Sequence, residues 1–184
     1  MSSEEIAVDI DRSETHIADL KSPVFFPVSL TKLVVLSICT YGCYEIYWFY
    51  QNWYLVKRRE KSNIMPVARS LFSYFYCYPL FSRVTEYAAK TTSHMPPPPA
   101  GILAAGWIVT TLLWKLPSPY WLVSFAAVLF MLPIQICINS INEKLAPEHD
   151  RNQRFSAWNI AAVVVGGLVL ILALIGTFLP EEQV

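Results

Sequence analysis

The sequence predicts an all-α integral membrane protein with four transmembrane helices and one interfacial amphipathic helix. Of its 184 residues, 54% are hydrophobic and only 15% are charged, which is more apolar than a typical water-soluble domain. One run of apolar residues near the C-terminus contains no charge over a length that spans a bilayer. Lys and Arg gather in two regions, as they do in cytoplasmic loops. We therefore divide the chain into a tail, residues 1–22, and a membrane helix bundle, residues 23–180.

The tail, residues 1–22, is acidic and polar, and it has neither the basic start nor the apolar core of a signal peptide. The tail has few apolar side chains, and burying them cannot offset the entropy that the chain would lose on folding. The composition therefore predicts disorder. A short partner-binding helix between Ile6 and Leu20 is the alternative.

The first predicted span covers residues 30–53. As one helix it measures about 36 Å, enough to cross a hydrocarbon core of about 30 Å with some tilt. Trp and Tyr side chains crowd its end, and a basic run, residues 57–61, follows at once. This order is typical of an aromatic belt at the cytoplasmic surface, and we expect Trp48 and Trp53 to belong to it.

Glu45 is the acidic residue within that span, and it is our first candidate functional residue. On a continuous helix Tyr41, Glu45 and Asn52 share one polar sector, which predicts that they face other helices and not lipid. One interpretation is a structural carboxylate, hydrogen-bonded to Tyr41, to Asn52 or to a neighbouring helix. The other is a proton or cation site, because burial disfavours the charged form of a carboxylate.

Residues 66–90 contain an apolar stretch too short to span, flanked by Arg69 and Arg83. The pattern favours an amphipathic helix on the cytoplasmic leaflet, with a shallow re-entrant hairpin turning at Pro79 as the alternative. Residues 93–101 are rich in proline and predict a stiff polyproline II spacer. Recognition of that spacer by a proline-binding module is the other interpretation.

The remaining predicted spans are residues 100–116, 120–141 and 160–179. The loop between the first two is short, so these two helices should be antiparallel. Gln135 and Asn139 form a polar ridge on the second, and such amides join helices or line a cavity. Ala162 and Gly166 on the last span are a pair of small residues that allows close helix contact.

The threading follows from the basic residues. Ten of the 14 Lys and Arg residues lie between Lys57 and Lys90 or between Lys144 and Arg154. Placing both regions in the cytoplasm predicts four spans with both termini periplasmic, in a bacterial inner membrane.

The stretch 40–53, TYGCYEIYWFYQNW, together with the loop PEHDRNQRFSAWN, resembles a family of uncharacterised bacterial multi-pass inner-membrane proteins. The hallmark of that family is a first helix of the form T-x-G-x-Y-x-x-Y-W-F-Y. The matching positions are Thr40, Gly42, Tyr44, Tyr47, Trp48, Phe49 and Tyr50. The resemblance covers residues 24–179 and implies a bacterial cytoplasmic membrane without an established activity.

Motifs of catalysis are missing from the sequence. The three histidines, His16, His94 and His149, lie in separate regions, and there is no nucleophile elbow, phosphate-binding loop or dinucleotide fingerprint. We predict no catalytic residue, no metal and no cofactor. The net charge of zero gives no electrostatic support for nucleic-acid binding. The expected partners are the lipid bilayer and a membrane protein or a second copy of the chain.

Three function classes remain. The first is a non-enzymatic protein acting through helix–helix interactions, such as a partner subunit, an assembly factor or an immunity-type protein. The second is a small oligomeric transporter or channel that uses Glu45 as a proton or cation site, with Gln135 and Asn139 along its path. The third, a membrane enzyme acting on lipid, is suggested by boundary charges: Arg69, Arg83, His149, Asp150 and Arg151.

Overall fold

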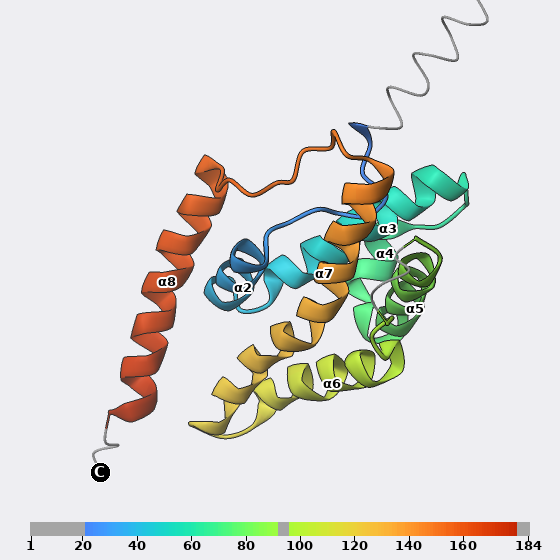
Figure 1. Cartoon of the computed structure of the whole chain (residues 1–184). Coiled ribbons are helices and arrows are strands. Elements are labelled where there is room, and N and C mark those ends of the chain that lie inside the picture. Colours follow the sequence, from blue (N-terminus) through green and yellow to red (C-terminus); the bar gives the residue numbers. More distant parts are fainter. Residues whose placement is uncertain (1–20, 92–95, 180–184) are drawn as a thin grey trace, which may run out of the picture.

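The computed structural model describes residues 21–91 and 96–179, which form helices without a β-strand, so the prediction of an all-helical protein is confirmed. Figure 1 shows the helices and the short helical turns η1 and η2 in chain order. Their bounds are α2 Leu30–Cys39, α3 Cys43–Glu60, α4 Pro66–Leu71, α5 Ser73–Thr91, α6 Ala100–Leu112, η1 Leu113–Lys115, η2 Tyr120–Ala126, α7 Ala127–Leu145 and α8 Ala157–Phe178. Residues 1–20, most of the predicted tail, and residues 93–95 of the predicted spacer lie outside the described residues; residues 96–99 have no regular structure.

The prediction of one continuous span over residues 30–53 is wrong. The chain turns between α2 and α3, where Tyr41 has φ 51° and Gly42 has φ 82°. The Gly42 N–H donates to the Ser37 carbonyl (2.9 Å) and the Tyr41 N–H to the Ile38 carbonyl (3.2 Å). This pattern is the Schellman motif that ends helices, and its left-handed residue is Tyr41, where a non-glycine side chain is uncommon. Gly42 comes next with a positive φ of its own, which glycine adopts at low cost, and α3 begins directly after it.

The core lies where α3, α5, α6 and α7 meet, and aromatic rings fill it. Phe49 stacks on Phe81 with ring centroids 6.2 Å apart, and it meets Trp107 edge-on at 5.0 Å. Trp48 and Trp53 are completely buried. The predicted aromatic belt therefore does not include these two residues; instead they pack inside the bundle, where they contribute large apolar area.

The segment 66–90 is helical, as α4 and α5, and α5 runs unbroken through Pro79 to Thr91. The alternative of a hairpin turning at Pro79 is therefore wrong. One face of α5 packs on α6 and α7 and buries Leu80 and Phe81, while residues such as Phe75 remain exposed. Its position along a membrane surface stays a prediction.

Within the described residues, two helices are long and apolar enough to cross a membrane: Tyr120–Leu145, which joins η2 to α7, and Ala157–Phe178, which is α8. They correspond to the third and fourth predicted spans. Helix α2 has 10 residues and α6 has 13, which gives lengths of about 15 and 20 Å, short of the bilayer core. Four spans are therefore not established.

Helix α8 lies at one side of the molecule in Figure 1, and none of its residues is buried. It touches α2, and the contact is closest at Gly166, where an added Cβ would lie 1.8 Å from the Cys39 carbonyl oxygen. The small residue predicted to allow close helix contact thus does so within the chain, between α8 and α2.

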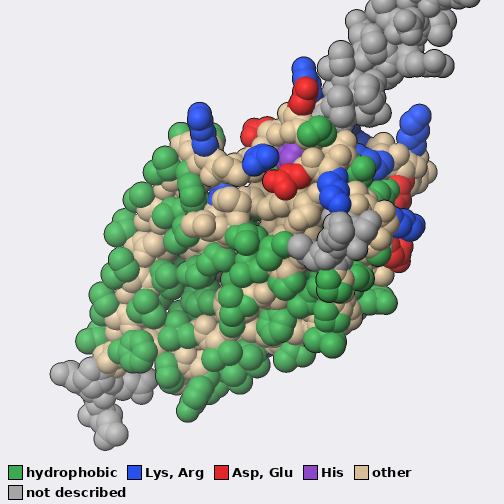
Figure 2. Space-filling view, viewed as in Figure 1, with side chains coloured by type: hydrophobic (Ala, Val, Ile, Leu, Met, Phe, Trp, Pro, Cys, Tyr) green, Lys and Arg blue, Asp and Glu red, His purple; other side chains and the backbone are tan. Residues whose placement is uncertain are grey.

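Charged side chains gather at one end of the molecule, and the rest of the face in Figure 2 is largely hydrophobic. At the start of α2, the Lys32 ammonium donates to Asn152 Oδ1 (2.7 Å) and to the Arg154 carbonyl (2.8 Å). The start of α2 therefore lies beside the basic loop before α8. The predicted threading placed these two regions on opposite sides of the membrane because it took residues 30–53 as one straight helix, whereas the chain turns at Tyr41 and Gly42.

Candidate ligand-binding cavity

The turn between α2 and α3 determines where Glu45 lies. Thr40 serves both helices, because its Oγ1 donates to the Leu36 carbonyl (2.7 Å) and accepts from the Tyr44 N–H (2.9 Å). Glu45 follows in the first turn of α3. A carboxylate at this position interacts favourably with the positive end of the helix dipole.

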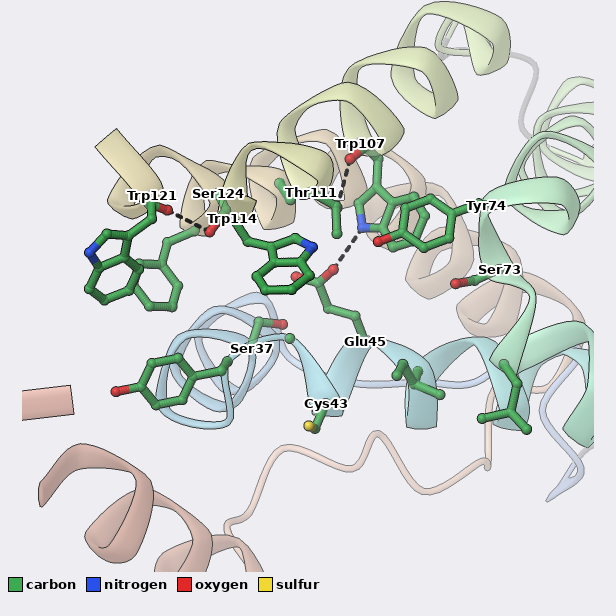
Figure 3. Close-up of a pocket in the computed structure, with 16 residues that line it drawn as sticks. Ser37, Cys43, Glu45, Ser73, Tyr74, Trp107, Thr111, Trp114, Trp121 and Ser124 are labelled. Atoms are coloured by element: carbon green, nitrogen blue, oxygen red, sulfur yellow. Dashed lines mark hydrogen bonds between the residues drawn. The ribbon is translucent and has the colours of Figure 1, made fainter. Parts of the chain in front are cut away.

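The Glu45 side chain is buried, with 6% of its surface exposed. Its Oε2 accepts a hydrogen bond of 2.7 Å from the Trp107 indole N–H of α6, as Figure 3 shows. The hydroxyl of Ser37, itself 3% exposed, approaches the carboxylate without completing a hydrogen bond. Glu45 is thus held by one neutral donor, and no cationic side chain among the described residues pairs with it.

A cavity of about 470 Å³ opens beside the carboxylate, within the size range of small-molecule sites. It lies among the start of α3, helix α6 and the turns η1 and η2, away from the charged end of the molecule. Six of its 16 lining residues are aromatic: Tyr41, Tyr74, Trp107, Trp114, Trp121 and Phe125. Trp114 is 59% exposed, so the cavity is open on that side. Cys43 lies on α3 beside the cavity, but its thiol is exposed and in Figure 3 points away from Glu45, to the opposite side of the helix.

A second polar cluster, which we call the amide ladder, consists of Asn52, Gln135, Asn139 and Asn142. Its side chains bind the backbone of the extended segment 24–28, which contains a proline and belongs to no helix. Asn142 accepts from the Val24 N–H (2.8 Å) and the Phe25 N–H (3.2 Å), and it donates to the Phe25 carbonyl (2.8 Å). The side-chain amides thereby replace the backbone pairing that this buried segment lacks.

The other members of the amide ladder bind in the same way. Asn52 Oδ1 accepts from the Phe26 N–H (3.0 Å), Gln135 Nε2 donates to the Phe26 carbonyl (3.3 Å), and Asn139 Nδ2 donates to the Val28 carbonyl (3.0 Å). Gln135 Oε1 also accepts from the Trp48 indole N–H (2.6 Å). The ladder is a set of satisfied structural hydrogen bonds.

The structure thus separates the predicted site residues into two groups. Glu45 and Tyr41 line the cavity, although Tyr41 contacts the Phe125 ring and makes no hydrogen bond to the carboxylate. Asn52, Gln135 and Asn139 belong to the amide ladder and do not line the cavity. Gln135 joins α7 to α3 through the Trp48 indole, whereas the other bonds of Gln135 and Asn139 to distant residues go to segment 24–28, which is not helical. The placement of Gln135 and Asn139 along a path shared with Glu45 is wrong for this cavity, because neither side chain lines it.

Sequence reasoning missed Trp107 as the partner of Glu45, and it missed the aromatic wall. Trp107 is 62 residues away in the sequence, and no local pattern pairs an indole with a distant carboxylate. A Gly two residues after Thr40 was a visible signal for the turn. Among the described residues, no three His, Cys, Asp or Glu side chains lie close enough together to hold a metal ion.

No family model, no curated protein and no solved structure matches the chain. The resemblance to uncharacterised inner-membrane proteins stays a prediction.

Proposed function

We propose that the chain is an integral membrane protein that binds a small solute in the cavity beside Glu45, in the manner of a small transporter, and that it is not an enzyme. The main support for this proposal is the cavity, which contains the buried Glu45 carboxylate hydrogen-bonded by the Trp107 indole N–H. Of the function classes that the sequence left open, this geometry favours the second.

Membrane insertion is supported by α8. Its 22 residues carry no charge, none is buried, and large apolar side chains such as Leu172, 68% exposed, point away from the chain. Soluble monomers rarely expose so much continuous apolar surface, whereas a bilayer covers it without cost. The charged end in Figure 2 then lies in water, on the cytoplasmic side of a bacterial inner membrane by the positive-inside rule.

This orientation places the start of α2 and the loop before α8 on the cytoplasmic side and the end of α8 on the periplasmic side. Reporter fusions at the loop around Glu148 and after Val184 test the proposal. Alkaline phosphatase should be active only after Val184, and activity at the loop would contradict the orientation.

A solute site requires that small molecules reach the cavity, and a cysteine placed at Thr111, which lines it from α6, reports this. In a chain with Cys39→Ser and Cys43→Ser, a small neutral thiol reagent, methyl methanethiosulfonate, should modify Thr111→Cys in the folded protein. Ser124→Phe fills the cavity from η2 and should slow this modification several-fold. Val123→Phe is the matched control, because Val123 lies on the same element, is 48% exposed and does not line the cavity.

Equal rates for the two Phe variants, or a thiol at position 111 that reacts only after unfolding, would overturn the proposed function. Fluorescence-detected gel filtration of each variant in detergent separates slowed access from failed folding. Mass spectrometry assigns the modified cysteine, since Cys77 and Cys137 are buried.

The second candidate function is association with a partner subunit or with a second copy of the chain. The observation that favours it is the exposed face of α8, which Gly167 and Gly176 leave open to close contact, since an added Cβ at either meets nothing within 4 Å. Disulfide cross-linking between Gly167→Cys chains in native membranes tests self-association. Cross-links that form no faster than those of an Ile160→Cys control would contradict it.

A further inference from the structure

The cavity beside Glu45 carries one acidic side chain and no basic one. Among the described residues that line it, Glu45 is the acid, and no Lys, Arg or His takes part. A carboxylate without a cationic partner in an apolar setting is costly, so a bound positive charge would stabilise it. An anionic solute would meet a repulsive charge at the same place.

The carboxylate also has unused hydrogen-bonding capacity. The Trp107 N–H donates to Oε2, and among the described residues it is the donor that hydrogen-bonds to this carboxylate. The buried Ser37 hydroxyl beside it has no hydrogen-bond partner either. In Figure 3 the carboxylate lies between the Trp107 and Trp114 rings, so its open side faces the cavity. Both unsatisfied groups therefore point to a ligand in this space.

The walls favour an organic cation over a metal ion. Rings from α2–α3, α5, α6 and η2 surround the space, and the faces of aromatic rings attract cations, above all those that are weakly hydrated. A metal ion needs several oxygen, nitrogen or sulfur ligands. Among the described residues Glu45 is the one carboxylate that lines the cavity, and no group of three His, Cys, Asp or Glu side chains surrounds it. A cavity of about 470 Å³ is also far larger than a single ion requires.

We infer that the cavity binds a monovalent organic cation with apolar or aromatic substituents, with Glu45 as its counter-ion and the Trp107 and Trp114 rings against it. This inference rests on the proposed function, because it names the class of solute that the cavity takes. Trp107 then acts as a positioning residue, since its N–H directs the carboxylate while its ring faces the solute.

The test uses the full chain with Cys39→Ser, Cys43→Ser and Thr111→Cys in nanodiscs of neutral phosphatidylcholine. The introduced thiol reacts with methanethiosulfonates to form a mixed disulfide and release methanesulfinate. Two reagents are compared, one with a trimethylammonium group and one with a sulfonate group. Each rate with the protein is divided by the rate of the same reagent with free cysteine. This ratio should be at least about tenfold higher for the cationic reagent than for the anionic one, because Glu45 attracts the positive charge.

Glu45→Gln should remove this preference while the rate with the neutral reagent stays within about twofold. The ratio of the two charged reagents cancels any effect of Glu45 on the thiol itself, because both reagents attack the same thiolate. An unchanged ratio in Glu45→Gln would overturn the inference.

Equilibrium binding gives a second measurement. Benzyltrimethylammonium should protect the thiol of Thr111→Cys from the neutral reagent, and its uncharged carbon isostere, neopentylbenzene, should protect at least tenfold less well. Glu45→Gln should bring the two compounds to similar affinities. If both protect equally in the chain that keeps Glu45, the cavity binds apolar solutes and the charge inference is wrong while the proposed function stands. If Ser124→Phe has no effect on access, the proposed function fails as well.

Discussion

The amide ladder and the Glu45 cavity are both polar clusters inside an apolar bundle, and they differ in how completely their groups are satisfied. In the ladder, Asn142 is fully buried and makes three hydrogen bonds to the backbone of Val24 and Phe25. In the cavity, Glu45 is held by one hydrogen bond and Ser37 by none. A saturated polar cluster stabilises the fold, whereas an unsaturated one beside an empty space is available to a ligand.

The largest expected effect lies in the ladder. Asn142→Leu removes the side chain that satisfies two N–H groups and one carbonyl of a buried segment, and each such loss costs about 1–3 kcal/mol. We expect a fall in unfolding free energy of about 3 kcal/mol or more, or a protein that does not fold. Denaturant or thermal unfolding in detergent measures it. Gln153→Leu is the matched control, because it replaces a side-chain amide by the same residue at an exposed loop position.

A stability loss below about 1 kcal/mol for Asn142→Leu would contradict the view that the ladder holds segment 24–28. In that case the ladder and the cavity would not differ in the way proposed.

A smaller effect is expected for Trp107→Phe. This change keeps an aromatic ring but removes the indole N–H, the one group among the described residues that donates a hydrogen bond to Glu45. The unpaired buried carboxylate should cost about 1–3 kcal/mol of unfolding free energy. In a Glu45→Leu background the same Trp107→Phe change should cost less, because no carboxylate is left unpaired. The double-mutant cycle isolates this coupling. Additive losses in the two single variants would mean that the hydrogen bond contributes nothing measurable.

The smallest effect is expected for Ser37→Ala. The Ser37 hydroxyl is buried and unpartnered, so removing it takes away no hydrogen bond and relieves its desolvation cost. The unfolding free energy should stay within about 0.5 kcal/mol of the wild type or rise. Thr40→Ala is the matched control, since the Thr40 hydroxyl bonds to both α2 and α3, and it should be clearly destabilising. A loss of more than about 1 kcal/mol in Ser37→Ala would show that the hydroxyl is engaged after all.

Local patterns in the sequence were enough to predict the all-helical class, the apolar run that forms α8 and the role of the ridge amides in joining segments. Each depends on spacing along one helix or on a run of apolar residues, and such information is contiguous in the chain. The close contact at Gly166 was predicted for the same reason, although its partner, α2, was not.

What only the tertiary structure decided is which distant groups meet. The first span failed because a left-handed turn at Tyr41 and Gly42 redirects the chain, and hydropathy averaged over residues 30–53 does not register one pair of backbone angles. The cavity depends on rings from α5, α6 and η2 that converge on Glu45 across long separations in sequence. Composition and periodicity determine which side of each helix is buried; packing determines that Glu45 lies against Trp107 and that Asn142 lies against Phe25.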